Sequence, residues 1–90
     1  MIKDVILCMQ EIEKSAKGAA DTSKIKKDIQ SAKTKLAGAG GGHALPLKRL
    51  SDELSVWQDK LDMILKESAG RQGMAKHARH WVEELRKIDV

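Results

Sequence analysis

The fold of this chain is decided by residues 47–64, which read LKRLSDELSVWQDKLDMI. Apolar side chains recur in this stretch at alternating spacings of three and four residues. Such spacing places them on one narrow stripe of an α-helix, the kind of seam that packs against another helix. The stretch therefore predicts a helix that buries one face and exposes the other. The members of the stripe are Leu47, Leu50, Leu54, Trp57, Leu61 and Ile64.

Three further stripes with the same helical spacing cover most of the remaining chain. We therefore predict an all-α fold, a small antiparallel helical bundle in which residues 1–90 form a single helical domain. One stripe lies at the N-terminus, one follows it, and one lies at the C-terminus: Ile2, Val5, Met9, Ile12, Ala16 and Ala19; Ile25, Ile29, Ala32 and Leu36; Met74, Ala78, Trp81, Leu85 and Ile88.

Glycine and proline mark the expected boundaries between helices. The glycine-rich segment 38–45 is incompatible with a stable helix, because each glycine costs about 1 kcal/mol relative to alanine, and we expect a connecting loop there. Pro46 suits the first position of a helix, which we place at about 46–67. A short polar connection over 68–73 then leads to a last helix at about 72–87, with Arg86 and Lys87 near its C-terminus, as the helix dipole prefers.

The first 37 residues allow two interpretations, because the N-terminal stripe does not continue in register past Ala19. Its next positions hold Ser23 and Lys26, and the new stripe starts at Ile25. Either a break over 18–23 separates two helices, or one long helix of about 54 Å contains a three-residue shift of its seam. We favour the continuous helix, since Gly18 is its one unfavourable residue.

Composition narrows the functional class without identifying it. The chain has 17 basic and 13 acidic residues, a formal net charge of +4, and neither Phe nor Tyr. No apolar run approaches the roughly 20 residues that a membrane-spanning helix needs, so we expect no membrane insertion. The single cysteine, Cys8, cannot form an intramolecular disulfide, which favours a reducing cytoplasmic location. We interpret Cys8 as a buried small apolar residue, because nothing in the sequence supplies a base to activate it.

The candidate metal ligands are His77, His80 and Glu84. Offsets of three and four residues bring these side chains to one quadrant of a helix, and histidines with a carboxylate are a partial ligand set for zinc or iron. Three ligands from one helix usually need a fourth from elsewhere, and the Glu-x-x-His motif of di-iron bundles is absent. We therefore interpret His77 as bordering the seam and the other two as facing water, and predict no metal site or cofactor.

Two other patterns are candidates for ligand-binding sites: the glycine run and a group of lysines. The glycine run lacks the lysine and the hydroxyl residue of a phosphate-binding loop, and we interpret it as a connector. Lys24, Lys27 and Lys35 fall on one flank of the seam and are the candidate nucleic-acid contacts. Both tryptophans lie on seams, so no exposed aromatic residue is expected to stack on bases.

We predict a non-enzymatic helical module for protein–protein interaction or oligomerisation, acting as a small subunit or adaptor, with no catalytic residues. The alternative is a nucleic-acid-associated protein that uses the Lys/Arg-rich helix flanks, and a third possibility is a metal-binding bundle or enzyme. Because a core of this size is marginal alone, we expect a homo-oligomer or an unknown protein partner. The expected interface residues are Leu50, Leu54, Trp57, Leu61 and Trp81.

Overall fold

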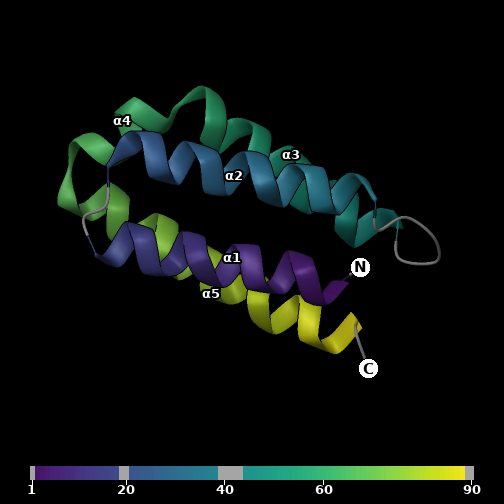
Figure 1. Ribbon diagram of the computed structural model, residues 1–90. Coiled ribbons are helices and arrows are strands. Elements are labelled where there is room, and N and C mark those ends of the chain that lie inside the picture. Colours follow the sequence, from purple (N-terminus) through teal and green to yellow (C-terminus); the bar gives the residue numbers. More distant parts are fainter. Residues whose placement is uncertain (1, 19–20, 39–43, 89–90) are drawn as a thin grey trace.

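The protein is an all-α bundle, as the stripes predict. The computed structural model describes residues 2–18, 21–38 and 44–88, and within these ranges no residue forms a β-strand (Figure 1). Its helices are α1 (Ile2–Lys17), α2 (Thr22–Ala37), α3 (Ala44–Asp59), α4 (Leu61–Lys66) and α5 (Ser68–Ile88).

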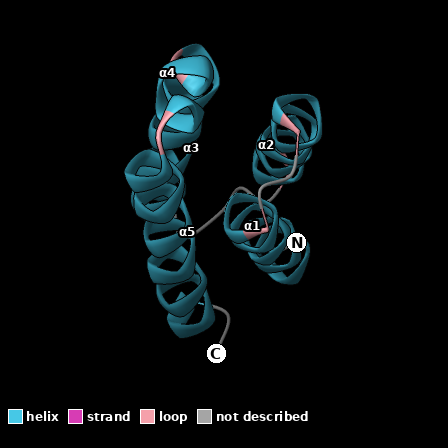
Figure 2. Cartoon of the chain, turned by 90° about the vertical axis from the view of Figure 1, so that its left-hand side faces the viewer, coloured by secondary structure: helices cyan, strands magenta, loops and turns pink. Residues whose placement is uncertain are grey.

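The helices form two antiparallel layers. Helices α1 and α2 form one hairpin. Helices α3 and α4 follow one path along the bundle and α5 runs back beside it, which forms the other hairpin (Figure 1). Seen along the bundle, α1 and α2 stand on one side, and α3, α4 and α5 on the other (Figure 2). The most extensive packing joins α1 to α5 and α1 to α2, followed by α2 to α3. In each of these three pairs the two helices run antiparallel (Figure 1).

One apolar core lies between these layers, and every helix contributes to it. All four members of the stripe in α2 are buried, as predicted, and the stripe of residues 47–61 is buried as well. None of the helices in the described ranges combines the length and the apolar character that a membrane span requires. The side chains with no exposed surface include Val5, Met9, Ile12, Ile25, Ile29, Ala32, Leu50, Leu54, Ala78 and Leu85.

The preference for one continuous N-terminal helix is wrong. Helix α1 ends at Lys17 and α2 begins at Thr22, with Asp21 in an extended conformation at the N-cap position. A continuous helix over 2–37 would be about 54 Å long, whereas the longest extent of the molecule is 37 Å. Folding back at this point lets the stripes of α1 and α2 face each other, so that both are buried.

The helix expected at about 46–67 is also divided. It begins earlier, at Ala44, and is interrupted at Lys60, whose backbone departs from helical geometry (φ −111°, ψ 17°). Backbone hydrogen bonds continue across the interruption, from Lys60 N to Val56 O and from Ile64 N to Lys60 O, both at 3.0 Å. The junction of α3 and α4 is therefore a local distortion of one helical path and not a loop.

The connection expected over 68–73 is helical, which corrects the prediction. Only Glu67 (φ −119°, ψ 148°) separates α4 from α5, and both glycines of the segment lie inside α5. The glycine at position 70 serves a close approach of α5 to α4 and not a break in the helix, because a Cβ atom there would lie 2.0 Å from the carbonyl oxygen of Ile64. Of the glycine-rich segment, Gly38 caps α2 and Ala44 and Leu45 belong to α3, while 39–43 lie outside the described residues.

Replacing Gly70 by alanine should destabilise the protein, because its Cβ would collide with the backbone of α4. We expect a loss of about 1–3 kcal/mol in the free energy of unfolding, the usual cost of overpacking, measured by urea denaturation.

Gly73→Ala is the matched control, since outside the neighbouring residues and the local backbone of α5 no atom of the described chain lies within 4 Å of a Cβ placed there. It should be neutral or stabilise α5 by up to about 1 kcal/mol. Equal stabilisation by both substitutions would contradict the close approach at Gly70.

Candidate protein-binding groove between α3 and α5

The side of the bundle between α3 and α5 is less extensively packed than the sides between α1 and α5, α1 and α2, and α2 and α3, and we call it the open side. The two helices face each other there without the extensive packing that joins the other neighbouring helices. A groove of about 770 Å³ lies between the N-terminal part of α3 and the C-terminal part of α5. We call it the α3–α5 groove. It is lined by Leu45, Pro46, Arg49, His80, Trp81, Glu84, Lys87 and Ile88.

Trp81 is the large aromatic side chain of this groove, and its position differs from the predicted one. The predicted stripe placed Trp81 on the seam of the last helix, but Val82 is buried in its stead and Trp81 is only half-buried at the edge of the core. Two helical stripes share Ala78 and Leu85, one passing through Trp81 and the other through Val82. Spacing alone cannot distinguish them.

Glu53 connects the two helices in the middle of their open side. The indole Nε1–H of Trp81 donates a hydrogen bond to Glu53 Oε2 at 2.6 Å, and His77 Nδ1 lies 3.2 Å from Glu53 Oε1. Beyond this bridge is a smaller hollow of about 230 Å³, which Trp57 and Ile64 help to line. The bridge therefore orients Trp81 and separates the two depressions.

Sequence reasoning did not single out Glu53, Arg49 or Leu45. Glu53 is one acidic residue among many, and no local pattern relates it to a tryptophan 28 positions away. Leu45 did carry a signal, because it lies off the stripe that starts at Leu47. An apolar side chain there has no place in the core, and the structure leaves 63% of it exposed.

The charges around the α3–α5 groove are mostly positive. Arg49 is exposed on α3 and makes no ion pair with another described residue. On α5, Glu84 Oε1 lies 3.7 Å from His80 Nε2 and 3.9 Å from Lys87 Nζ. Among the described lining residues Glu84 is the one carboxylate, and it has the ammonium of Lys87 and the imidazole of His80 beside it on its own helix, whereas Arg49 is available to a ligand.

The three candidate metal ligands lie on α5, where two of them, His80 and Glu84, contact each other and the third, His77, turns to α3. His77 contacts Glu53 on α3, and His80 contacts Glu84. Within the described ranges, no group of three or more His, Cys, Asp or Glu side chains is arranged to hold a metal ion. His80 therefore contributes to the α3–α5 groove as a polar edge residue, whereas His77 lines the smaller hollow beyond Glu53.

Four of the five expected interface residues are enclosed by the chain itself. Leu50 and Leu54 have no exposed surface, and Trp57 and Leu61 are 6% and 3% exposed. They belong to the core between the two layers. Of the five, Trp81 is the residue that a partner can reach without opening the bundle.

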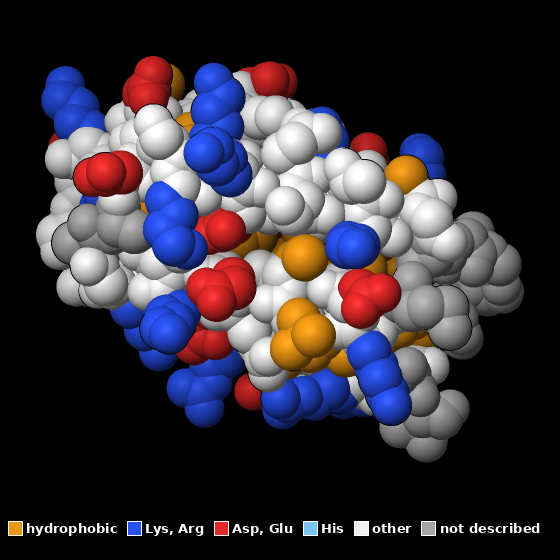
Figure 3. All heavy atoms as spheres, viewed as in Figure 1, with side chains coloured by type: hydrophobic (Ala, Val, Ile, Leu, Met, Phe, Trp, Pro, Cys, Tyr) orange, Lys and Arg blue, Asp and Glu red, His pale blue; other side chains and the backbone are white. Residues whose placement is uncertain are grey.

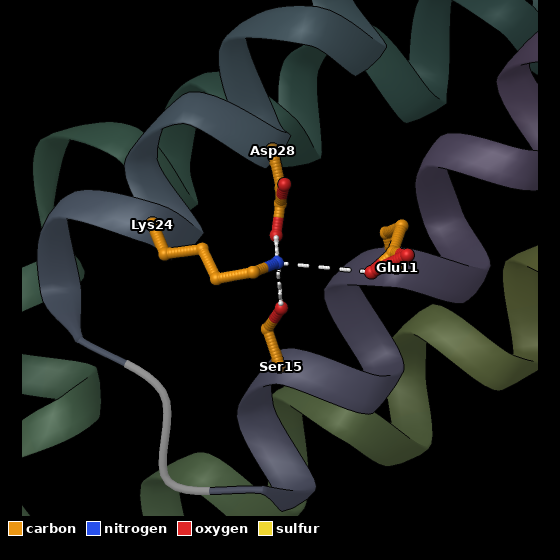
Figure 4. Close-up of polar contacts among 4 residues, drawn as sticks. All are labelled: Glu11, Ser15, Lys24 and Asp28. Carbon is orange, nitrogen blue, oxygen red and sulfur yellow. Dashed lines mark hydrogen bonds and ion pairs between the residues drawn. The ribbon is translucent and has the colours of Figure 1, made fainter.

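Lys24, one of the candidate nucleic-acid contacts, is engaged between α1 and α2 (Figure 4). Its Nζ donates hydrogen bonds to Ser15 Oγ at 2.9 Å and Asp28 Oδ2 at 3.1 Å, and lies 3.7 Å from Glu11 Oε2. The other two candidates, Lys27 and Lys35, are exposed on α2. On the face that α1 and α2 present, basic and acidic side chains are interspersed (Figure 3).

Ser15 and Lys24 form a pair that is also found in serine hydrolases, where a neutral lysine removes the hydroxyl proton. Here the hydrogen bond with Asp28 raises the pKa of Lys24, so that its amine stays protonated and cannot act as a base. Ser15 is itself buried and donates to Asp28 Oδ2 at 2.9 Å. The cluster therefore satisfies a buried hydroxyl and joins α1 to α2.

Cys8 lies half-buried against the core. Desolvation by burial raises the pKa of its thiol, and the nearby ammonium of Lys35 opposes this effect only in part. The thiolate is the reactive form of cysteine, so burial lowers the reactivity expected of Cys8.

Comparisons with known proteins add no assignment to this geometry. A scan against protein-family models, a search among curated proteins and a search among solved structures found no match for the chain.

Glu53→Ala should destabilise the protein by about 1–2 kcal/mol, because it removes a charge-assisted hydrogen bond from a partly exposed bridge. The indole proton resonance of Trp81 should also move upfield in a ¹H–¹⁵N spectrum, while that of Trp57 stays in place.

Glu83→Ala serves as the control, since Glu83 is exposed on α5 and pairs only loosely with Arg79, at 3.9 Å. It should change the free energy of unfolding by less than about 0.5 kcal/mol. An unchanged Trp81 resonance in Glu53→Ala would refute the bridge.

Iodoacetamide should alkylate Cys8 more slowly in the folded protein than in urea at the same pH, because the raised pKa leaves less thiolate and burial limits access. Lys35→Gln should slow the reaction further, since the opposing positive charge is lost. Mass spectrometry of timed samples measures both rates. Faster alkylation of the folded protein would show that the thiol is activated.

Proposed function

We propose that this protein is a non-enzymatic interaction module that receives a helix of a protein partner in the α3–α5 groove. The observation that carries the proposal is the half-buried Trp81, held by Glu53 at the edge of a groove of about 770 Å³ on the open side of the bundle.

The shape and the residues of the α3–α5 groove support this proposal. A helix that docks between two others buries an apolar face in a groove, a recurring mode of peptide recognition. Tryptophan is enriched among the residues that dominate interface energies, because it buries a large apolar surface and offers an N–H donor. The α3–α5 groove supplies such a residue together with Leu45, Pro46 and Ile88.

The burial of the apolar stripes within the chain also supports the proposal. The buried stripes contact one another, so a partner that leaves the bundle intact binds to a surface outside the core. Self-association, which the seams alone suggested, would need the same surface, and the mass of a captured partner distinguishes it from binding of a different protein.

The test introduces a photoreactive p-benzoylphenylalanine at position 45 in the cells that naturally make the protein. Leu45 is 63% exposed and lines the groove, whereas Leu7 is 60% exposed on α1 and does not line it, so position 7 is the matched control. We expect a discrete protein adduct from position 45 that is absent from position 7 and is lost when Trp81→Ala is added.

The mass of the adduct distinguishes a second copy from a different protein. The absence of an adduct from position 45, the same adducts from both positions, or an adduct that persists in Trp81→Ala would overturn the proposal.

A further inference from the structure

We infer that the occupant of the α3–α5 groove is an acidic amphipathic helix of two to three turns. This inference rests on the proposed function, because it specifies the partner of the same groove. Size and charge each contribute to it.

The dimensions of the groove fit a short helix. Its lining residues on α5 run from His80 to Ile88, a distance of about 12 Å at 1.5 Å per residue. Two turns of a docked helix cover about 11 Å. Apolar side chains at spacings of three and four on such a helix would face Leu45, Trp81 and Ile88.

The charge of the lining favours carboxylates on that helix. Arg49 stands on the α3 wall without an ion pair to another described residue, and Lys87 stands on the α5 wall, 75% exposed. Among the described lining residues Glu84 is the one carboxylate, and it already has His80 and Lys87 as neighbours. An acidic flank on the ligand would meet Arg49, which can bind a carboxylate through two N–H groups.

The same charges disfavour other occupants. A basic helix would bring like charges against Arg49 and Lys87, and such contacts suppress wrong partners. A second copy docked groove to groove would face the same cations across the contact. The net charge of the chain, +4, adds long-range attraction for an acidic ligand.

The experiment uses three synthetic amphipathic peptides of about 12 residues, a little over three helical turns. They share leucines at alternating spacings of three and four and differ only in carrying Glu, Gln or Lys at the polar positions. Binding to the full chain is measured by fluorescence anisotropy of labelled peptides, and the indole resonance of Trp81 reports whether the groove is occupied.

We expect the Glu peptide to bind roughly tenfold more tightly than the Lys peptide and to shift the Trp81 resonance but not that of Trp57. Arg49→Glu should reverse the order of the Glu and Lys peptides. Lys27→Glu, which makes the same charge change on α2 outside the groove, should retain the order; circular dichroism checks that both variants fold.

The outcomes distinguish failure of the acidic preference alone from failure of the groove as a helix-binding site. If all three peptides shift Trp81 with equal affinity, or if Arg49→Glu leaves the order unchanged, the groove binds helices but the acidic preference is wrong. If none of them shifts Trp81 at about 1 mM, the weak end of specific affinity, the α3–α5 groove is not a helix-binding site and both proposals fail.

Discussion

The burial of the α1 stripe against two helices at once is the interaction on which the rest of this structure depends. Val5, Met9 and Ile12 have no exposed surface, and α1 has the most extensive packing with both α2 and α5. Because α1 occupies the centre, α3 is supported mainly by α2, and α5 mainly by α1 and α4. The bundle is thus well packed on three sides, and the groove lies on the fourth.

Polar side chains join the helices at the margins of this core. On the α1–α2 side, Lys24 links Ser15 and Asp28, and on the α2–α3 side Lys33 Nζ donates to Gln58 Oε1 at 3.0 Å. On the open side, Glu53 bridges α3 to α5. Burial of a polar group is costly without a hydrogen-bond partner, and these contacts provide such partners at the edges.

The core and the candidate site use different side chains, and the composition of the chain explains why. Because the chain has neither Phe nor Tyr, its core is built mainly from the leucine and isoleucine stripes. These stripes are buried in the contacts between the two layers. Val82 is buried, whereas Trp81 lies at the edge of the core, where its indole N–H reaches Glu53. The proposed recognition surface therefore consists of side chains that the core does not contain.

The sequence by itself determined the helical class, the stripe from Ile25 to Leu36, and the stripe from Leu47 to Leu61, because alternating spacings of three and four fit one face of a helix and no strand. Only the tertiary structure decided the turn after Lys17, the helical conformation of Gly70 and the choice of Val82 over Trp81 as the buried residue. Each of these depends on which helix lies opposite. Local spacing gives the same signal for both stripes through Ala78 and Leu85, and packing against α1 decides between them.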